Sequence, residues 1–462
     1  MLVYVICYGA GMLFASSAHY YLSGAALLFA ALWLYGGDCR KSGNLLDLKA
    51  LFSLFFVGGQ GISCLKLSRL QTDWASMTWL CFFGAVVCFR LACDLVGKKL
   101  SSGREAAKEG QSGERSVQAE PGFAVLGNGE QGNRYDVWIF RAVILLTALS
   151  LAAFLLEAAI LGYVPFLVRG VPHAYSYFHI SGVHYVTVSC VLVPSMAVLW
   201  WFYTGGFRGE KRNKRKTALV CGAVLAALAI PILCVSRFQL IFGVILAVLI
   251  FMVVTGNKKL RYLVMAAAAL VPLYVVLTIA RSHDVEYLNG IFEMKNSRMP
   301  IFITQPYMYI ANNYDNFNCL VEQLPEHSMG LKGMFPLWAL TGLKFLVPEL
   351  VNWPLYTTKE ELTTVTLFYD AYYDFGILGV MGFGALLGAA ARFLTWKTRP
   401  GKNPAWYLLY SQAALYFMLS FFTTWYSNPT TWFYFAVTLA FAIWCDERKN
   451  IFWRFYLWYQ KK

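Results

Sequence analysis

The chain has 462 residues, of which 58% are hydrophobic and only 14% are charged, and its formal net charge is +14. This hydrophobic share lies above that of typical soluble domains, which excludes an ordinary soluble globular protein. The positive charge falls mostly in connections between apolar runs, without a basic domain interleaved with aromatic residues, which argues against a nucleic-acid partner. We therefore expect an all-α polytopic membrane protein.

Apolar runs close to the roughly 20 residues that a spanning helix needs predict about twelve transmembrane helices. The first run follows Met1 without a basic region or a small-residue cleavage site, so we expect a membrane helix there rather than a removable signal peptide. The runs lie at residues 2–17, 22–37, 50–68, 75–97, 137–160, 183–204, 218–235, 239–255, 262–280, 374–395, 405–421 and 431–446.

The runs and the connections between them divide the chain into six predicted parts. The last part mixes cations with Trp and Phe, which is typical of a helix lying in the membrane interface. The parts are an N-terminal four-helix membrane portion (1–97), a flexible cytoplasmic linker rich in Gly, Ser and Glu (98–136), central membrane helices (137–280), a large extracytoplasmic loop (281–373), C-terminal membrane helices (374–446) and a cytoplasmic interfacial tail (447–462).

Lys and Arg gather on one side of the predicted helices, for example at 98–115, 208–216 and 258–261. Because translocation of positive charge is disfavoured, this side is predicted to be cytoplasmic, with both termini inside. The loop 281–373 then faces outward. Its runs are apolar and aromatic and are broken by prolines, which predicts short interfacial or re-entrant helices that cover a cavity.

Histidines and carboxylates on the predicted outer face are candidates for acid–base chemistry. All six histidines lie on or beside that face, and His283 and His327 in the long loop are candidate catalytic residues. The alternative interpretation is that histidine is simply tolerated in wet loops. Asp315 in the same loop is a third candidate for a general base.

Arginines on the predicted outer face are unexpected and indicate a specific role, because the positive-inside rule makes cations scarce there. Guanidinium groups bind phosphate in bidentate fashion, which makes a lipid diphosphate a candidate ligand. The alternative is that Arg237 and Arg281 extend from helix ends to lipid headgroups. The residues concerned are Arg169, Arg237, Arg281 and Arg298.

Aromatic residues are dense on the same face, with Tyr309 and Tyr314 among them. Such rings can stack on the apolar faces of sugars, and an ordinary interfacial aromatic belt explains many of them equally well. The helix centres hold almost no ionisable side chain, which argues against an ion-coupled transporter. Arg90 and Asp94, four residues apart near a helix end, are expected to pair as a structural link.

Five segments after about residue 137 carry a resemblance to a known family. They are LGYVPFLVRGVPHAYSYF (161–178), SRFQLIFGVILAVLIF (236–251), RSHDVEYLNGIFEMKNSR (281–298), YIANNYDNF (309–317) and FYDAYYDFGILGVMGFGALLG (368–388). Together with the number of helices and the long outer loop, they resemble the bacterial oligosaccharide repeat-unit polymerases, the Wzy-type O-antigen and capsule polymerases.

The resemblance implies a GT-C-like fold, similar to that of membrane glycosyltransferases with polyprenyl-diphosphate donors, in the bacterial cytoplasmic membrane. The implied reaction joins undecaprenyl-diphosphate-linked oligosaccharide repeat units on the outer face during surface polysaccharide synthesis. Outer-loop arginines are important in that family. The catalytic candidates are therefore His283, His327, Asp315 and Arg281, and the substrate-binding candidates are Arg169, Arg237, Arg298, Tyr309 and Tyr314.

The expected substrates are lipid-diphosphate-linked oligosaccharides, and neither a cofactor nor a metal is expected. A chain-length regulator and a flippase are candidate protein partners. Two alternative functions stay open. One is an O-antigen ligase-like enzyme, which transfers a finished glycan from the same lipid to a different acceptor. The other is a lipid-linked oligosaccharide flippase or another transporter.

Overall fold

A computed structural model of the chain describes residues 1–109, 132–168, 174–208, 213–256, 285–398 and 403–446, together with five residues between 261 and 268. Throughout these residues the regular structure is helical, and the one extended pairing is an isolated bridge between Ser68 and Met294. The predicted all-α class is thereby confirmed.

Within the described residues, seven helical stretches are long and apolar enough to cross a membrane. This confirms a polytopic membrane protein, while the number of twelve spans remains a prediction. Most of the predicted run at 262–280 lies outside the described residues. The stretches are α2 (Tyr20–Ser42), α5 (Ser76–Glu109), α6 (Gly132–Leu161), α8 to α9 (Val183–Val188, Ser189–Leu192 and Val193–Tyr203), α10 (Lys214–Leu233), α11 (Arg237–Thr255) and α17 (Tyr369–Lys397).

Shorter apolar helices coincide with four further predicted runs. They are too short to cross a bilayer as straight helices, since each residue adds only about 1.5 Å. They are α1 (Leu2–Ser16), the continuous stretch α3–η1–α4 (Leu48–Phe52, π-helical Ser53–Val57 and Gly58–Ser63), α18 (Ala405–Met418) and α19 (Pro429–Trp444).

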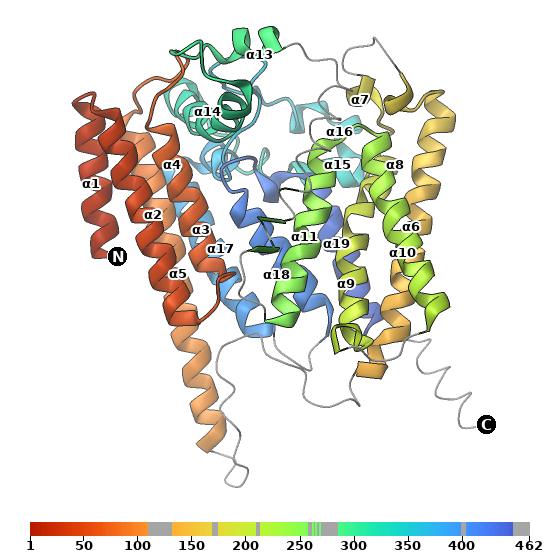
Figure 1. Ribbon diagram of the computed structural model, residues 1–462. Helices are drawn as coiled ribbons and strands as arrows, with labels where there is room; N and C mark the ends of the chain where they lie inside the picture. The colour runs from red at the N-terminus through yellow and green to blue at the C-terminus, as the bar shows by residue number, and fades with distance from the viewer. Residues whose placement is uncertain are drawn as a thin grey trace. The chain divides into compact units, whose positions relative to one another are not determined.

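The chain folds into two compact units, each built from separated pieces of sequence. Unit 1 comprises Met1–Gly122, Asp284–Trp396 and Tyr416–Thr431, and unit 2 comprises Phe123–His283, Lys397–Leu415 and Trp432–Lys462. Within unit 1, α1, α2 and α4 pack side by side, and within unit 2, α9 packs against α6, α10 and α11 (Figure 1). The six predicted parts follow the sequence in order, whereas the packing joins the N-terminal helices to the region after residue 284.

Aromatic stacking and close helix contacts build the core of unit 1. The ring centroids of Phe52 and Phe89 lie 4.0 Å apart, and those of Phe56 and Phe368 lie 5.0 Å apart. Such pairs contribute about 0.5–1.5 kcal/mol each beyond their burial. Gly388 of α17 lies so close to the Phe89 backbone of α5 that a Cβ atom there would overlap it, so glycine allows these two helices to touch.

Arg90 and Asp94 do not pair with each other as expected, and each has a partner from another helix. The Arg90 guanidinium donates to Asp38 at 2.6 Å and to Ser53 at 2.7 Å, and Asp94 accepts from Lys49 at 2.5 Å. The prediction considered one helix face alone. The tertiary structure places Asp38 of α2 within reach of Arg90 inside the unit, where a charge needs a partner.

Two connections are more helical than predicted. The linker expected at 98–136 is helical at both ends, because α5 continues to Glu109 and α6 begins at Gly132, while 110–131 lie outside the described residues. Strong helix formers such as Ala, Lys and Glu in the sequence from Arg104 to Glu109 favour this extension.

The predicted outer loop contains one long helix as well as the short ones expected. This long helix, α14 (Ile301–Gln323), has 23 residues, beside α13 (Val285–Phe292), α15 (Phe335–Thr341), α16 (Leu343–Leu346) and η5 (Pro348–Leu350). It is not among the seven apolar stretches, because its buried residues include several asparagines.

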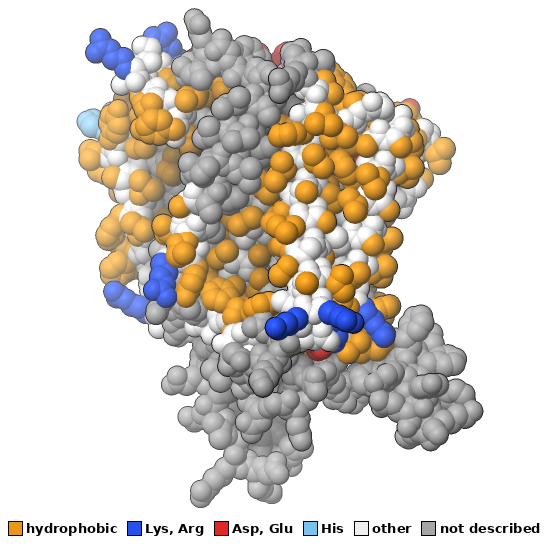
Figure 2. Space-filling view, turned by 45° about the vertical axis from the view of Figure 1, so that its right-hand side comes forward, with side chains coloured by type: hydrophobic (Ala, Val, Ile, Leu, Met, Phe, Trp, Pro, Cys, Tyr) orange, Lys and Arg blue, Asp and Glu red, His pale blue; other side chains and the backbone are white. Residues whose placement is uncertain are grey.

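Hydrophobic side chains predominate over the helices on the face that Figure 2 shows, and most Lys and Arg side chains there lie near the helix ends. Several hydrophobic side chains of the described helices are more than half exposed, such as Leu155 at 56% and Leu225 at 70%. A soluble protein does not expose large apolar patches of this kind without a partner, whereas lipid-facing helices do.

Candidate functional site

Helix α14 carries polar side chains that are buried in the protein interior. Its buried side chains include Asn312, Asn313, Asp315, Asn316 and Asn318, each at most 1% exposed. Buried polar groups cost free energy unless they are hydrogen-bonded, so a helix of this composition needs partners from neighbouring segments. The contacts of these five residues show which segments supply them.

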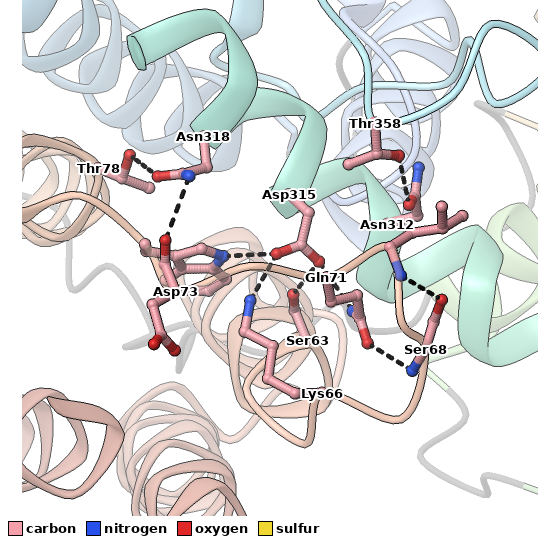
Figure 3. A network of polar contacts seen from close by, with 12 residues as sticks. Ser63, Lys66, Ser68, Gln71, Asp73, Thr78, Asn312, Asp315, Asn318 and Thr358 are labelled. Atoms are coloured by element: carbon pink, nitrogen blue, oxygen red, sulfur yellow. Dashed lines mark hydrogen bonds and ion pairs between the residues drawn. The ribbon is translucent and has the colours of Figure 1, made fainter. Parts of the chain in front are cut away.

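The Asp315 carboxylate binds four donors from the last residue of α4 and from the segment between α4 and α5 (Figure 3). The Lys66 ammonium donates to Oδ1 at 2.5 Å and the Trp74 indole N–H at 2.9 Å, while Oδ2 accepts from Gln71 at 2.8 Å and from Ser63 at 3.2 Å. Both partners of the ion pair are buried, with side-chain exposures of 5% for Lys66 and 0% for Asp315. The pair is therefore a fully hydrogen-bonded internal link.

This environment corrects the proposed role of Asp315 as a general base. A base must reach a substrate proton, and the carboxylate is enclosed by four protein donors. Tyr314 is likewise fully buried, and its hydroxyl donates to the Phe56 carbonyl at 2.8 Å, so it belongs to the core rather than to a sugar-binding surface. Burial, which the sequence pattern did not reveal, separates both residues from substrate.

The asparagines of α14 hold a second segment in place. The Thr358 hydroxyl donates to Asn312 at 2.9 Å, and the Thr358 N–H donates to Asn316 at 2.8 Å. On the opposite side, Asn318 accepts from the Thr78 hydroxyl at 2.7 Å (Figure 3). It also accepts from the Ala75 N–H at 2.8 Å. Helix α14 thus fixes the start of α5 and the segment 356–368 before α17, here called the strap. It acts as a scaffold.

His327 lies exposed against the first turns of α17. Its Nδ1 is 3.2 Å from the Tyr373 carbonyl, which requires the proton on Nδ1, and its Nε2 faces Gly376. Asp374 of α17 accepts from the Ser328 hydroxyl and from the backbone N–H of Gly333 at 2.9 Å. These contacts tie the 327–333 turn to α17, so His327 is an exposed residue with a packing role.

Lys332 extends from this turn into a half-buried position. Its ammonium lies 4.4 Å from the centre of the Tyr373 ring and 3.5 Å from the Trp353 carbonyl. Burial lowers the pKa of Lys332, and the charges of Asp370 and Asp374 oppose that shift. The arrangement is a cation held between an aromatic ring and two carboxylates.

The remaining candidates are dispersed. Tyr309 is 38% exposed with its ring centroid 6.0 Å from that of Phe422, and Arg298 is exposed just before α14. Arg237 begins α11 and is buried, which favours a role inside unit 2 over an extension to lipid headgroups. Three candidates lie outside the described residues, namely Arg169, Arg281 and His283.

Unit 2 contains a carboxylate–imidazole pair that stands out from these contacts. Glu157, near the end of α6, is 0% exposed and lies 3.1 Å from Nδ1 of His184, whose side chain is 21% exposed. The same carboxylate accepts from the Thr187 hydroxyl at 2.7 Å and from the Ile180 N–H at 3.0 Å. Three donors thus stabilise its ionised form.

This pair has the geometry of an oriented base. A carboxylate acceptor at Nδ1 fixes the proton on that atom, which leaves Nε2 of His184 to accept a proton from another group. The ring of His179 lies beside it, with centroids 5.0 Å apart. The half-exposed imidazole can therefore act in proton transfer.

The Glu157–His184 pair lies at the end of α6 that is remote from Asp136. Glu157 is 21 residues along α6 from Asp136, which pairs with Lys216 at 3.0 Å, so about 30 Å separate the two carboxylates. Arg237, the first residue of α11, is buried in the same unit.

No protein-family model, curated protein or solved structure matches the chain. The centre of the candidate site is the Glu157–His184 pair.

The sequence contains a signal for this pair. Glu157 is close to the end of one predicted membrane helix and His184 is at the start of the next, so antiparallel packing brings both to one membrane level. A carboxylate within an apolar run needs a partner, and the histidine at that level is the nearest choice.

Proposed function

We propose that the protein polymerises undecaprenyl-diphosphate-linked oligosaccharide repeat units on the outer face of the bacterial cytoplasmic membrane. The observation that carries this proposal is the imidazole of His184, oriented by the buried Glu157 at the end of α6 remote from the cation-rich end. The charge distribution predicts that this end faces outward. A base at the outward end of unit 2, together with a buried arginine in the same unit, suits transfer from a lipid diphosphate.

In the proposed reaction a hydroxyl of one lipid-linked unit attacks the anomeric carbon of the glycan carried by another. The new C–O bond forms as the bond between that carbon and the diphosphate oxygen breaks. Nε2 of His184 takes the hydroxyl proton, and Glu157 stabilises the resulting imidazolium. The proton then passes to water or to the released lipid diphosphate.

The departing diphosphate carries the developing negative charge. Arg237, which is buried at the start of α11, is the described residue assigned to stabilise it. Arg169 and Arg281 keep their predicted roles in diphosphate binding, and no geometry is assigned to them. Arg298, exposed before α14 in unit 1, remains a candidate for contact with headgroups or with the glycan.

The test is incubation of the purified protein with its lipid-diphosphate-linked repeat unit alone, followed by separation of the products by size. A ladder of lengthening glycans supports the proposal. His184→Gln should lower the rate of ladder formation by about 10²- to 10⁴-fold, the usual contribution of a general base. His327→Gln is the matched control and should retain most activity.

The outcomes separate the alternatives. Loss of the ladder with His327→Gln but not with His184→Gln would move the base to unit 1. If native substrate and folded protein give no ladder, a second acceptor should be added. Transfer of a finished glycan to that acceptor would indicate a ligase, and no transfer at all would contradict both enzyme assignments.

A further inference from the structure

A short-helix segment of unit 1 exposes an unusual amount of apolar surface. It spans residues 329–355 and contains α15, α16 and η5. Phe345 and Leu346, at the end of α16, are 65% and 78% exposed. Its other exposed apolar side chains are Met329 at 71%, Val347 at 42%, Leu355 at 40%, Met334 at 39% and Leu340 at 37%.

The start of this segment contacts α17 at the point where the exposed apolar side chains of that helix begin. Asp374 holds the start of the segment by accepting from the N–H groups of Lys332 at 3.2 Å and Gly333 at 2.9 Å. A Cβ atom on Gly330 would lie 3.4 Å from the Phe375 ring, so the turn contacts that side chain. Phe375 is 52% exposed and Leu378, three residues on, is 76% exposed.

The geometry of the segment excludes a crossing of the bilayer. Helix α15 has 7 residues and α16 has 4, so they measure about 10 Å and 6 Å, whereas the hydrocarbon core is about 30 Å thick. Gly342, with φ of 78°, separates the two helices. A segment of this kind, attached at the level where a spanning helix starts, can only run along the membrane boundary.

Its polar groups are arranged for that boundary. The Lys344 ammonium lies 4.9 Å from the centre of the Phe345 ring, so a cation is paired with the face of an aromatic side chain. The indole N–H of Trp338 donates to the Leu331 carbonyl at 2.9 Å, which satisfies the polar atom of an amphipathic ring. Both features are typical of residues between water and lipid.

We propose that residues 334–355 lie in the membrane interface, with Phe345 and Leu346 in contact with lipid acyl chains. Lipid is favoured as the occupant because the exposed side chains continue the apolar surface of α17, which itself must face lipid if α17 spans the bilayer. The inference depends on α17 spanning a membrane, and it does not depend on the proposed reaction.

Spin labelling tests the depth of this segment. A nitroxide is attached at Leu346→Cys in protein reconstituted into phosphatidylethanolamine–phosphatidylglycerol vesicles. The parent protein carries Cys221→Ser, because Cys221 is exposed, and the labelled parent supplies the background from its other cysteines. Leu378→Cys on α17 is the lipid reference, and Glu361→Cys, at an exposed acidic residue of the strap, is the water reference.

We expect oxygen to collide with the label at position 346 more often than a water-soluble nickel chelate does. The label at position 378 should show the same preference, and the label at position 361 should show the opposite one. Equal access of the chelate at positions 346 and 361 would place the segment in water. An immobile label that neither reagent reaches would show that protein, such as a second copy of the chain, covers the segment. Either result overturns the proposal, and neither requires enzymatic activity.

Discussion

Nε2 of His327 lies 3.0 Å from the position that a Cβ atom on Gly376 would occupy. Gly376 has φ of 58° and ψ of −145°, and with Phe375 it interrupts the helical geometry of α17 about two turns after its start. The break directs the first turn of the helix toward the 327–333 turn. Glycine at this position therefore satisfies both a backbone conformation and a close contact.

Gly376→Ala should destabilise the protein by about 1–3 kcal/mol, because an L side chain is strained at this φ and its Cβ atom meets the imidazole. Thermal unfolding of the detergent-purified protein, followed by fluorescence, measures the change. Gly382→Ala in the same helix is the control, since a Cβ atom there would meet nothing within 4 Å. Equal melting temperatures of the two variants would contradict the role of Gly376.

Asp315→Asn should cost about 3–5 kcal/mol of stability, because it leaves the buried Lys66 ammonium without its counter-ion. A lower melting temperature and a lower yield of monodisperse protein measure this loss. The double variant Asp315→Asn with Lys66→Met removes both charges and should recover part of the stability. A variant Asp315→Asn that melts like the wild type but forms no polymer would restore Asp315 as a candidate base.

Glu157→Gln should lower kcat by about 10²- to 10⁴-fold with a smaller change in KM, because the neutral amide neither stabilises the imidazolium nor fixes one ring tautomer. Initial rates of ladder formation at several substrate concentrations measure both constants. Thr187→Val removes only one donor to the carboxylate and should cost less than about tenfold. Similar losses for both variants would indicate general disruption of the site.

Lys332→Met should raise the melting temperature at pH 7, because burial disfavours the ammonium in the folded protein and lowers its pKa. In the unfolded chain Lys332 keeps its proton up to an ordinary pKa of about 10.4. Between the lowered and the ordinary pKa the unfolded state binds more protons, so wild-type stability gains with rising pH.

The advantage of Lys332→Met over wild type should therefore shrink as the pH is raised toward 10. Lys332→Arg is the control, since guanidinium stays charged across this range and its penalty should not shrink. Melting temperatures at pH 7, 8, 9 and 10 give the comparison. A difference between Lys332→Met and wild type that does not change with pH would refute the assignment of the shift to Lys332.

The membrane helices were predictable because each must satisfy the bilayer along its own length. Helix α14 was not predicted as a long helix, because its polarity resembles that of a loop. Its stability depends on partners such as Thr358 and Thr78, which only the tertiary structure supplies. Local hydropathy contains no information about such distant hydrogen bonds.

The candidate site was predictable in its residue types and not in its geometry. The sequence indicated outer histidines and arginines, and Arg237 remains a candidate as a buried cation in the same unit as the Glu157–His184 pair. Asp315 was chosen because it is a carboxylate in the long loop, and its partners lie in a segment far earlier in the chain. A carboxylate free for chemistry and one engaged in packing have the same sequence signal.

Lys66 and Asp315 contact each other but are far apart in the sequence, which has a consequence for synthesis of the chain. The two residues are 249 positions apart, so at about 5–20 residues per second a ribosome needs about 12–50 s to supply the carboxylate after the lysine. During that time the N-terminal helices enter the membrane with an ammonium that has no counter-ion. Unit 1 is thus completed late in translation, after most of unit 2 has been made.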